Sequence, residues 1–158
     1  MKIERTVLQH LNKVLGQYLI SINQYFLHAR ILKNWGFEGL GHPIYKKSIE
    51  DMKESDDLIE RILLLEGLPN LQELGKLLIG EDVPEILQCD LAREYEKRAT
   101  LVAAIEHLES VQDYVSRDLL SEMLDESEEY IDWIETQQEN IELMGLDVYL
   151  QKQIEKAD

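Results

Sequence analysis

Apolar side chains recur every three or four residues along most of the chain, which is the period of an amphipathic helix. Over residues 5–34 this stripe is continuous, and it comprises Leu8, Leu11, Leu15, Tyr18, Ile22, Tyr25, Ala29 and Leu32. The chain has only three prolines and eight glycines, and all but Gly16 fall between the periodic stretches or at their ends. Because these two residue types interrupt helices, the pattern predicts an all-helical chain.

The interruptions predict four long helices and a short fifth one. The segment GFEGLGHP, residues 36–43, is expected to separate the first two helices. Gly67 is expected to end the second helix, Asp82 with Pro84 to begin the third, and Ser116 to cap the fourth. The predicted helices span about 5–34, 44–66, 83–114, 117–144 and 147–154.

A long connection joins the second and third of these helices. Residues 67–82 contain Gly, Pro and Asn and show no helical period. Such a segment reaches about 50 Å when extended, whereas a helix of 23 residues is about 35 Å long. The connection can therefore run the length of a bundle and leave the two helices parallel. The predicted fold is a four-helix bundle with one long crossover, formed by a single domain over residues 1–158.

The charge of the chain narrows the classes of partner. The 158 residues include 32 Asp and Glu against 16 Lys and Arg, a formal net charge of −16. Phosphate contacts need clustered Lys and Arg, so this composition argues against a nucleic-acid partner and permits a cation-handling protein. The single cysteine, Cys89, excludes a disulfide framework. Without a long apolar run or a signal peptide, we expect a cytoplasmic protein with no membrane partner.

Carboxylates interrupt two of the apolar stripes. In the third helix, positions at steps of seven read Leu87, Glu94, Leu101, Leu108 and Val115, and in the second they read Ile44, Asp51, Leu58 and Leu65. Asp51 and Glu94 should therefore face the core, with Glu54 one turn beyond Asp51. A buried carboxylate is costly without a partner. Two interpretations stay open: a metal site inside the bundle, or carboxylates paired with Arg or hydrogen-bonded to Tyr18 or Tyr130.

The second helix also carries a further apolar face, formed by Tyr45, Ile49, Met52, Ile59 and Leu63. An amphipathic helix needs one such face, so a second one indicates a second partner, either another subunit or a flat cofactor. The first helix offers a matching set, Leu19, Ile22, Asn23 and Phe26. Most methionines fill gaps in a core, but the thioether of Met52 could also ligate haem iron.

Four runs carry a resemblance to a known family: LNKVLGQYLISINQYFLHARILKNWG, ERILLLEGLPNLQELGKLLIGEDV, DYVSRDLLSEML and IDWIETQ. Through them the chain closely resembles the bacterioferritins, the haem-containing bacterial members of the ferritin superfamily, over essentially its whole length. The resemblance implies a ferritin-like four-helix bundle with a short fifth C-terminal helix. It also implies a hollow shell of 24 subunits that stores ferric mineral.

The resemblance further implies a haem b site shared by two subunits, with one haem in each subunit dimer. One methionine from each subunit ligates the iron, and the matching position here is Met52. The positions that match the family's pocket are Leu19, Ile22, Asn23, Phe26, Tyr45, Ile49 and Leu71. Most of them belong to the further apolar faces of the first two helices, which favours Met52 as a ligand over a role in the core.

The ferroxidase centre of the family is matched only in part. It uses one Glu from each of two helices and a Glu-x-x-His pair from each of the other two. The corresponding positions here are Tyr18, Asp51 with Glu54, Glu94, and Ser127 with Tyr130. The remaining carboxylates, Asp51, Glu54 and Glu94, could hold one hard cation but should not assemble a diiron pair.

These implications lead to one main hypothesis and two alternatives. The main hypothesis is an iron-storage subunit that supplies the haem site, while a second bacterioferritin chain in a mixed shell supplies ferroxidase activity. A bacterioferritin-associated ferredoxin would pass electrons through the haem to release iron. The alternatives are an active ferroxidase that oxidises Fe²⁺ to Fe³⁺ at the altered carboxylate site, and a purely structural subunit. Positions that line pores in some family members match Asn34, Glu66, Asp132 and Thr136.

Overall fold

The computed structural model describes residues 1–73 and 75–154, which form five α-helices and no β-strand. The helices are α1 (Arg5–Asn34), α2 (Glu38–Leu64), α3 (Val83–Ser110), α4 (Tyr114–Met144) and α5 (Leu146–Ile154). The all-helical prediction is confirmed, and α1 and α5 begin and end within one residue of expectation. Residue 74 and the last four positions of the expected domain lie outside the described residues.

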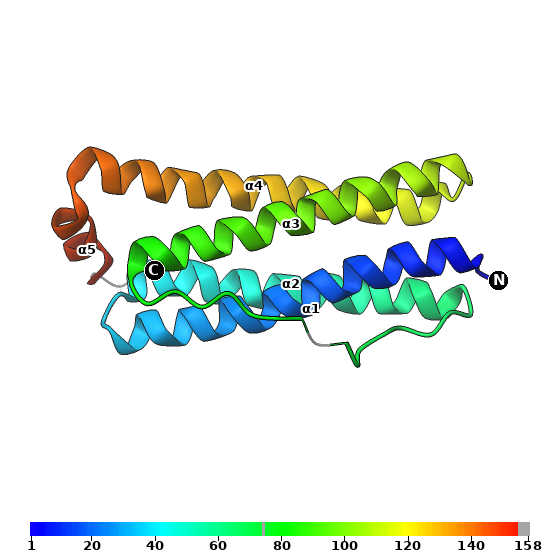
Figure 1. The fold of residues 1–158 in the computed structure, drawn as a ribbon, viewed down its shortest axis with the longest axis horizontal. Helices are drawn as coiled ribbons and strands as arrows, with labels where there is room; N and C mark the ends of the chain where they lie inside the picture. The colour runs from blue at the N-terminus through cyan, green and yellow to red at the C-terminus, as the bar shows by residue number, and fades with distance from the viewer. Residues whose placement is uncertain (74, 155–158) are drawn as a thin grey trace.

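The four long helices form a bundle of two antiparallel pairs (Figure 1). α1 packs along α2, and α3 packs along α4. The crossover after α2 runs beside α1 along the length of the bundle, so α2 and α3 point in the same direction. α5 lies at the end of the bundle opposite the N-terminus and contacts α2 and α4. The predicted ferritin-like bundle, with its long crossover and short fifth helix, is therefore confirmed.

Two apolar cores occupy the two halves of the bundle. One includes Leu11, Leu58 and Leu108, and the other includes Leu32 and Leu87, all fully buried. Each buried leucine contributes about 1.5–3 kcal/mol of transfer free energy. Along α2 and α3, buried polar residues lie between the two cores. The ends of the bundle thus supply apolar packing, and its middle carries the polar side chains.

The expected break over residues 36–43 is wrong for most of its length. α2 already begins at Glu38, with Pro43 inside the helix. Proline lacks the N–H that would bond back to residue 39, so α2 has one fewer backbone hydrogen bond in its second turn. Gly41 serves close packing, because a Cβ there would lie 3.2 Å from both Ala29 O and Leu32 Cβ. These residues therefore allow a tight α1–α2 contact in place of the predicted loop.

The expected end of the second helix is two residues too late. α2 ends at Leu64, and the residue with a left-handed φ, 61°, is Glu66. Gly67 N donates to Ile62 O at 2.9 Å, and a Cβ on Gly67 would come within 2.7 Å of Leu8 Cδ1. Gly67 therefore suits the close approach of α1, since a larger residue would require the Leu8 side chain to shift.

The turn between α3 and α4 also differs from the prediction of helices ending at 114 and beginning at 117. α3 ends at Ser110, and Asp113 caps α4 by accepting a hydrogen bond from Ser116 N at 3.1 Å. The assignment of Ser116 as the cap is therefore wrong, and Val115 leaves the core stripe to lie exposed. The predicted start of α3 is confirmed, since Asp82 accepts from Glu85 N at 2.9 Å. Over the described ranges, no helix is long and apolar enough to cross a membrane.

Candidate functional site

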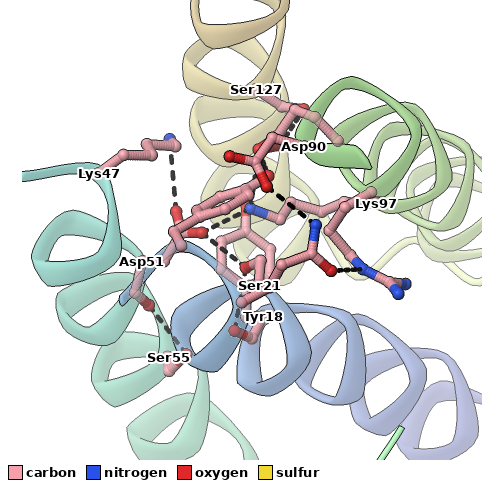
Figure 2. Close-up of polar contacts among 12 residues, drawn as sticks. Tyr18, Ser21, Lys47, Asp51, Ser55, Asp90, Lys97 and Ser127 are labelled. Carbon is pink, nitrogen blue, oxygen red and sulfur yellow. Dashed lines mark hydrogen bonds and ion pairs between the residues drawn. The ribbon is translucent and has the colours of Figure 1, made fainter. Parts of the chain in front are cut away.

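The middle of the bundle holds a cluster of buried charged side chains (Figure 2). Asp51 comes from α2, while Glu94 and Lys97 come from α3, and all three are 0% exposed. Glu94 and Lys97 share one face of α3 because they are three residues apart. The prediction that Asp51 and Glu94 face the core is confirmed.

Both oxygens of the Asp51 carboxylate lie beside a cation. Oδ2 accepts hydrogen bonds from Ser21 Oγ at 2.6 Å and from Lys97 Nζ at 2.7 Å. Oδ1 forms an ion pair with Lys47 Nζ at 3.3 Å. Charge-assisted bonds of this kind are stronger than neutral ones. The carboxylate is therefore stabilised by side chains of the chain itself.

Glu94 is held in the same way. Its Oε1 accepts hydrogen bonds from the Tyr25 hydroxyl at 2.8 Å and from Lys97 Nζ at 3.1 Å, and Oε2 accepts one from Ser127 Oγ at 2.9 Å. Lys97 Nζ thus bridges the carboxylates of α2 and α3. Of the two open interpretations, the structure agrees with the second, in which the carboxylates are paired with other side chains of the chain. Their partners are lysines in place of arginine, and Tyr25 in place of Tyr18 or Tyr130.

Three buried tyrosines surround the cluster. Lys97 Nζ lies 4.3 Å from the centroid of the Tyr18 ring and 5.4 Å from that of Tyr25, within the range of cation–π attraction. Burial raises the pKa of Tyr18, Tyr25 and Tyr130, and the nearby carboxylates raise it further. The phenols therefore stay protonated, which keeps the Tyr25 hydroxyl available as a donor to Glu94.

Lys47 completes the charge balance of the cluster. Its side chain is buried, and burial alone would lower the pKa of Lys47. The charges of Asp51 and Glu94 outweigh that effect and raise the pKa above its usual value. Two ammonium groups thus face two carboxylates in the middle of the bundle.

Glu54 has no such partners. Both of its carboxylate oxygens are inaccessible to solvent and lack a hydrogen-bond partner among the described residues. Within the same residues, no group of three His, Cys, Asp or Glu side chains is arranged to hold a metal ion. The structure therefore brings together Asp51 and Glu94 but not the full predicted ligand set. The cluster does not fit a diiron centre, because an ammonium lies between its two carboxylates.

A second buried polar cluster ties the crossover to the bundle. Gly80 N donates to His28 Nε2 at 3.0 Å, which assigns the proton of the neutral ring to Nδ1, and Nδ1 donates to Asp90 Oδ1 at 2.7 Å. Burial raises the pKa of Asp90, although the hydrogen bonds from His28 and Gln24 oppose this. Gln24 Oε1 also accepts from Leu78 N at 3.0 Å. These contacts fix the second half of the crossover to α1 and α3.

The outer face of α2 carries apolar side chains that are open to solvent among charged ones. Met52 directly follows Asp51 but is 53% exposed, because neighbouring residues on a helix point about 100° apart. Phe26 on α1 and Tyr45 on α2 are also exposed, with ring centroids 6.2 Å apart, and Tyr45 lies two turns before Met52. The other residues that were predicted to line a pocket vary in burial: Asn23 and Leu71 are exposed, Leu19 and Ile49 are half-buried, and Ile22 is buried.

The four residues predicted to line pores are all exposed, but they do not form one group. Asn34 ends α1, and Asp132 and Thr136 belong to the half of α4 nearer α5. Glu66 follows α2 at the opposite end of the bundle, where it pairs with the N-terminal ammonium at 3.1 Å. Within one subunit these residues cannot line a common channel.

Two members of the charged cluster, Lys47 and Lys97, were missed by the sequence analysis. A signal for Lys97 is nevertheless present, because Asp90, Lys97 and Ala104 also recur at steps of seven, each three residues after a position of the Leu87 stripe. A helix in a bundle buries both sets of positions. Counting both sets would have placed Lys97 in the core.

Comparison with known proteins gives matches that span the chain. The family model of the ferritin-like domain matches residues 8–144. A bacterioferritin of Brucella melitensis is 40% identical over 158 residues, which cover 100% of this chain and 98% of the relative. A bacterial ferritin of Synechocystis is 42% identical over 155 residues, 98% and 99% of the two chains. A bacterioferritin of Mycobacterium bovis is 39% identical over 149 residues, 94% of each chain.

Proposed function

The chain belongs to the bacterioferritins, within the ferritin-like family, and from this premise we propose that it is an iron-storage subunit of a 24-subunit shell in the cytoplasm. In this proposal the subunit binds haem b at the interface of a subunit dimer and has lost its own ferroxidase centre. Iron is the stored substrate. The excess of 32 acidic over 16 basic residues attracts Fe²⁺ to such a shell.

The outer face of α2 supports the haem site. Met52 presents an exposed thioether. Tyr45, two turns earlier on α2, and Phe26 of α1 present exposed aromatic rings with centroids 6.2 Å apart. Two copies of this face, related by a twofold axis, would bring two thioethers to one iron and cover the porphyrin with apolar side chains. The residues therefore fit a haem, with Leu19, Ile22, Asn23, Ile49 and Leu71 as further pocket walls. Bound there, haem would supply one-electron chemistry.

The loss of the ferroxidase centre rests on one observation, the position of Lys97. Its ammonium lies 2.7 Å from Asp51 Oδ2 and 3.1 Å from Glu94 Oε1. A diiron centre needs these carboxylates free to bind metal, together with ligands that are Tyr18, Ser127 and Tyr130 in this chain. We therefore assign ferroxidase activity to a second bacterioferritin chain in a mixed shell. A bacterioferritin-associated ferredoxin would deliver electrons to the haem for the reduction and release of stored iron.

Oxygen consumption after addition of Fe²⁺ tests the proposal. Haem-loaded shells of this chain alone should show slow uptake without a saturable fast phase. Shells assembled together with a ferroxidase-competent bacterioferritin chain should regain the fast phase. A fast, saturable phase in the pure shell would favour the alternative, an active ferroxidase at Asp51, Glu54 and Glu94.

Substitution of the methionine tests the haem site. Met52→Leu keeps an apolar side chain but removes the sulfur, so the absorption spectrum of thioether-ligated haem should be lost. The matched control is Leu64→Ala, an exposed apolar position of α2 outside the apolar face that contains Met52, which should retain that spectrum. If Met52→Leu bound haem with an unchanged spectrum, Met52 would not be a ligand. Wild-type shells that bind no haem would instead favour the purely structural subunit.

A further inference from the structure

We propose that Lys97 itself keeps metal ions out of the middle of the bundle, so that removal of its ammonium is sufficient to create a cation site between Asp51 and Glu94. This inference rests on the proposed loss of the ferroxidase centre and assigns a cause to it. The alternative cause is the absence of ligands at Tyr18, Ser127 and Tyr130. Each cause predicts metal binding in a different variant.

The geometry shows that the ammonium stands where a bridging cation would stand. Lys97 Nζ is within 3.1 Å of a carboxylate oxygen on each of two helices. The side chain is fully buried, and the Tyr18 ring lies against it at 4.3 Å. A metal ion cannot bind both carboxylates while this ammonium remains between them.

Charge leads to the same conclusion. The two ammonium groups of Lys47 and Lys97 neutralise Asp51 and Glu94. A divalent cation in this position would lie next to a buried like charge, and such repulsion is strong where water is excluded. Without Lys97, the two carboxylates would exceed the remaining Lys47 by one negative charge. The vacated volume would therefore favour a cation.

The donor atoms around Lys97 define the class of cation. They are the carboxylate oxygens of Asp51 and Glu94, with the hydroxyls of Ser21, Tyr25 and Ser127 at hydrogen-bond distance from those carboxylates. Oxygen donors suit hard ions such as Mn²⁺ and Mg²⁺, which retain several waters when two carboxylates bind them. Mn²⁺ is the better probe, because its anomalous scattering locates it in a crystal.

The test compares four shells in crystals soaked with Mn²⁺. Lys97→Ala should show an anomalous peak between Asp51 and Glu94, at about one ion per subunit. Wild type and Lys53→Ala, an exposed control on α2, should show none there. The double variant Ser127→Glu/Tyr130→His restores a Glu-x-x-His pair but keeps Lys97, and it should also show none. A peak in the double variant would overturn the inference, because missing ligands would then be the cause.

The remaining outcomes separate this inference from the proposed function. A peak in wild type would contradict both. An empty position in both wild type and Lys97→Ala would overturn the inference alone. Lys97→Gln covers the case in which Lys97→Ala does not fold, since it removes the charge but keeps a hydrogen-bond donor. It should gain Mn²⁺ at the same position, and an empty position in folded Lys97→Gln would likewise overturn the inference.

Discussion

The two faces of α2 differ in burial and in the partners that their side chains find within one chain. Asp51 and Met52 are neighbours in sequence, yet Asp51 is fully buried and Met52 is 53% exposed. On the inner face, Asp51 Oδ2 has two donors and Oδ1 has a cation beside it. On the outer face, Phe26, Tyr45 and Met52 leave apolar surface in contact with water.

This difference supports the proposed binding of other molecules to the outer face of the subunit. Burial of charge without a partner costs several kcal/mol, so the inner face had to be completed by the chain itself or by bound metal. The lysines complete it around Asp51 and Glu94, whereas Glu54 has no hydrogen-bond partner among the described residues. Exposed apolar area costs far less in a folded chain and can be covered later by assembly. The charges of Asp51 and Glu94 are therefore paired within the chain, and the outer face is where we propose that a second subunit and a cofactor bind.

The largest expected effect comes from removing the Lys97 ammonium, which pairs with the carboxylates on the inner face. Lys97→Met fills the volume but removes the ammonium between Asp51 and Glu94, and breaking a buried ion pair in this way costs about 3–5 kcal/mol. The free energy of unfolding in urea should fall by that amount. Lys53→Met, at an exposed position of α2, should leave it unchanged. A loss below about 1 kcal/mol would mean that the inner face does not depend on Lys97.

An intermediate effect is expected at the edge of the same cluster. Lys47 contacts Asp51 at 3.3 Å and makes fewer contacts than Lys97, so Lys47→Met should cost about 1–3 kcal/mol at neutral pH. The folded chain raises the pKa of Lys47, so its contribution is present in full below the unfolded pKa of about 10.4 and is lost as the pH rises through the folded value. Urea unfolding measured from pH 9 to pH 12 should therefore show a stability decline that is steeper in wild type than in Lys47→Met. Equal slopes would show that Lys47 does not stabilise the cluster through its charge.

The smallest expected effect is on the outer face. Met52→Gln should change the free energy of unfolding of the subunit by less than about 0.5 kcal/mol, because the side chain is exposed and makes little contact within the chain. The same variant should lose haem, which absorption spectroscopy detects. A large loss of subunit stability would contradict the comparison, since Met52 would then belong to the fold as well as to the proposed site.

The fold could be predicted from the sequence where local signals and packing agree. The stripe of α1 identified Arg5–Asn34, and the composition of residues 67–82 identified the crossover. The start of α2 could not be predicted in this way, because Gly41 and Pro43 resemble a loop when read locally. Their role is tertiary, since Gly41 allows α1 to approach. Helix ends that depend on contacts between helices are not encoded in a single stretch of sequence.

Half of the residues in the charged cluster were predicted from the sequence. Asp51 and Glu94 were found because a carboxylate on an apolar stripe is conspicuous. Lys97 was passed over, because a lysine near the edge of a stripe is usually solvated through its long side chain. Its pairing with Asp51 joins α3 to α2 over a sequence separation of 46 residues. No pattern within one helix can reveal which opposite charge a lysine will meet.

The buried ammonium groups also separate the folding of the chain from the supply of metal. A centre that needs free metal ions gains stability only as their concentration rises, whereas side chains of the same molecule are always present in a fixed ratio. Asp51 and Glu94 obtain their counter-charges from Lys47 and Lys97 as soon as the helices pack. A strong chelator should therefore leave the stability of the bundle unchanged. In a cell without available iron, the subunit can be made, folded and kept ready before there is any iron to store.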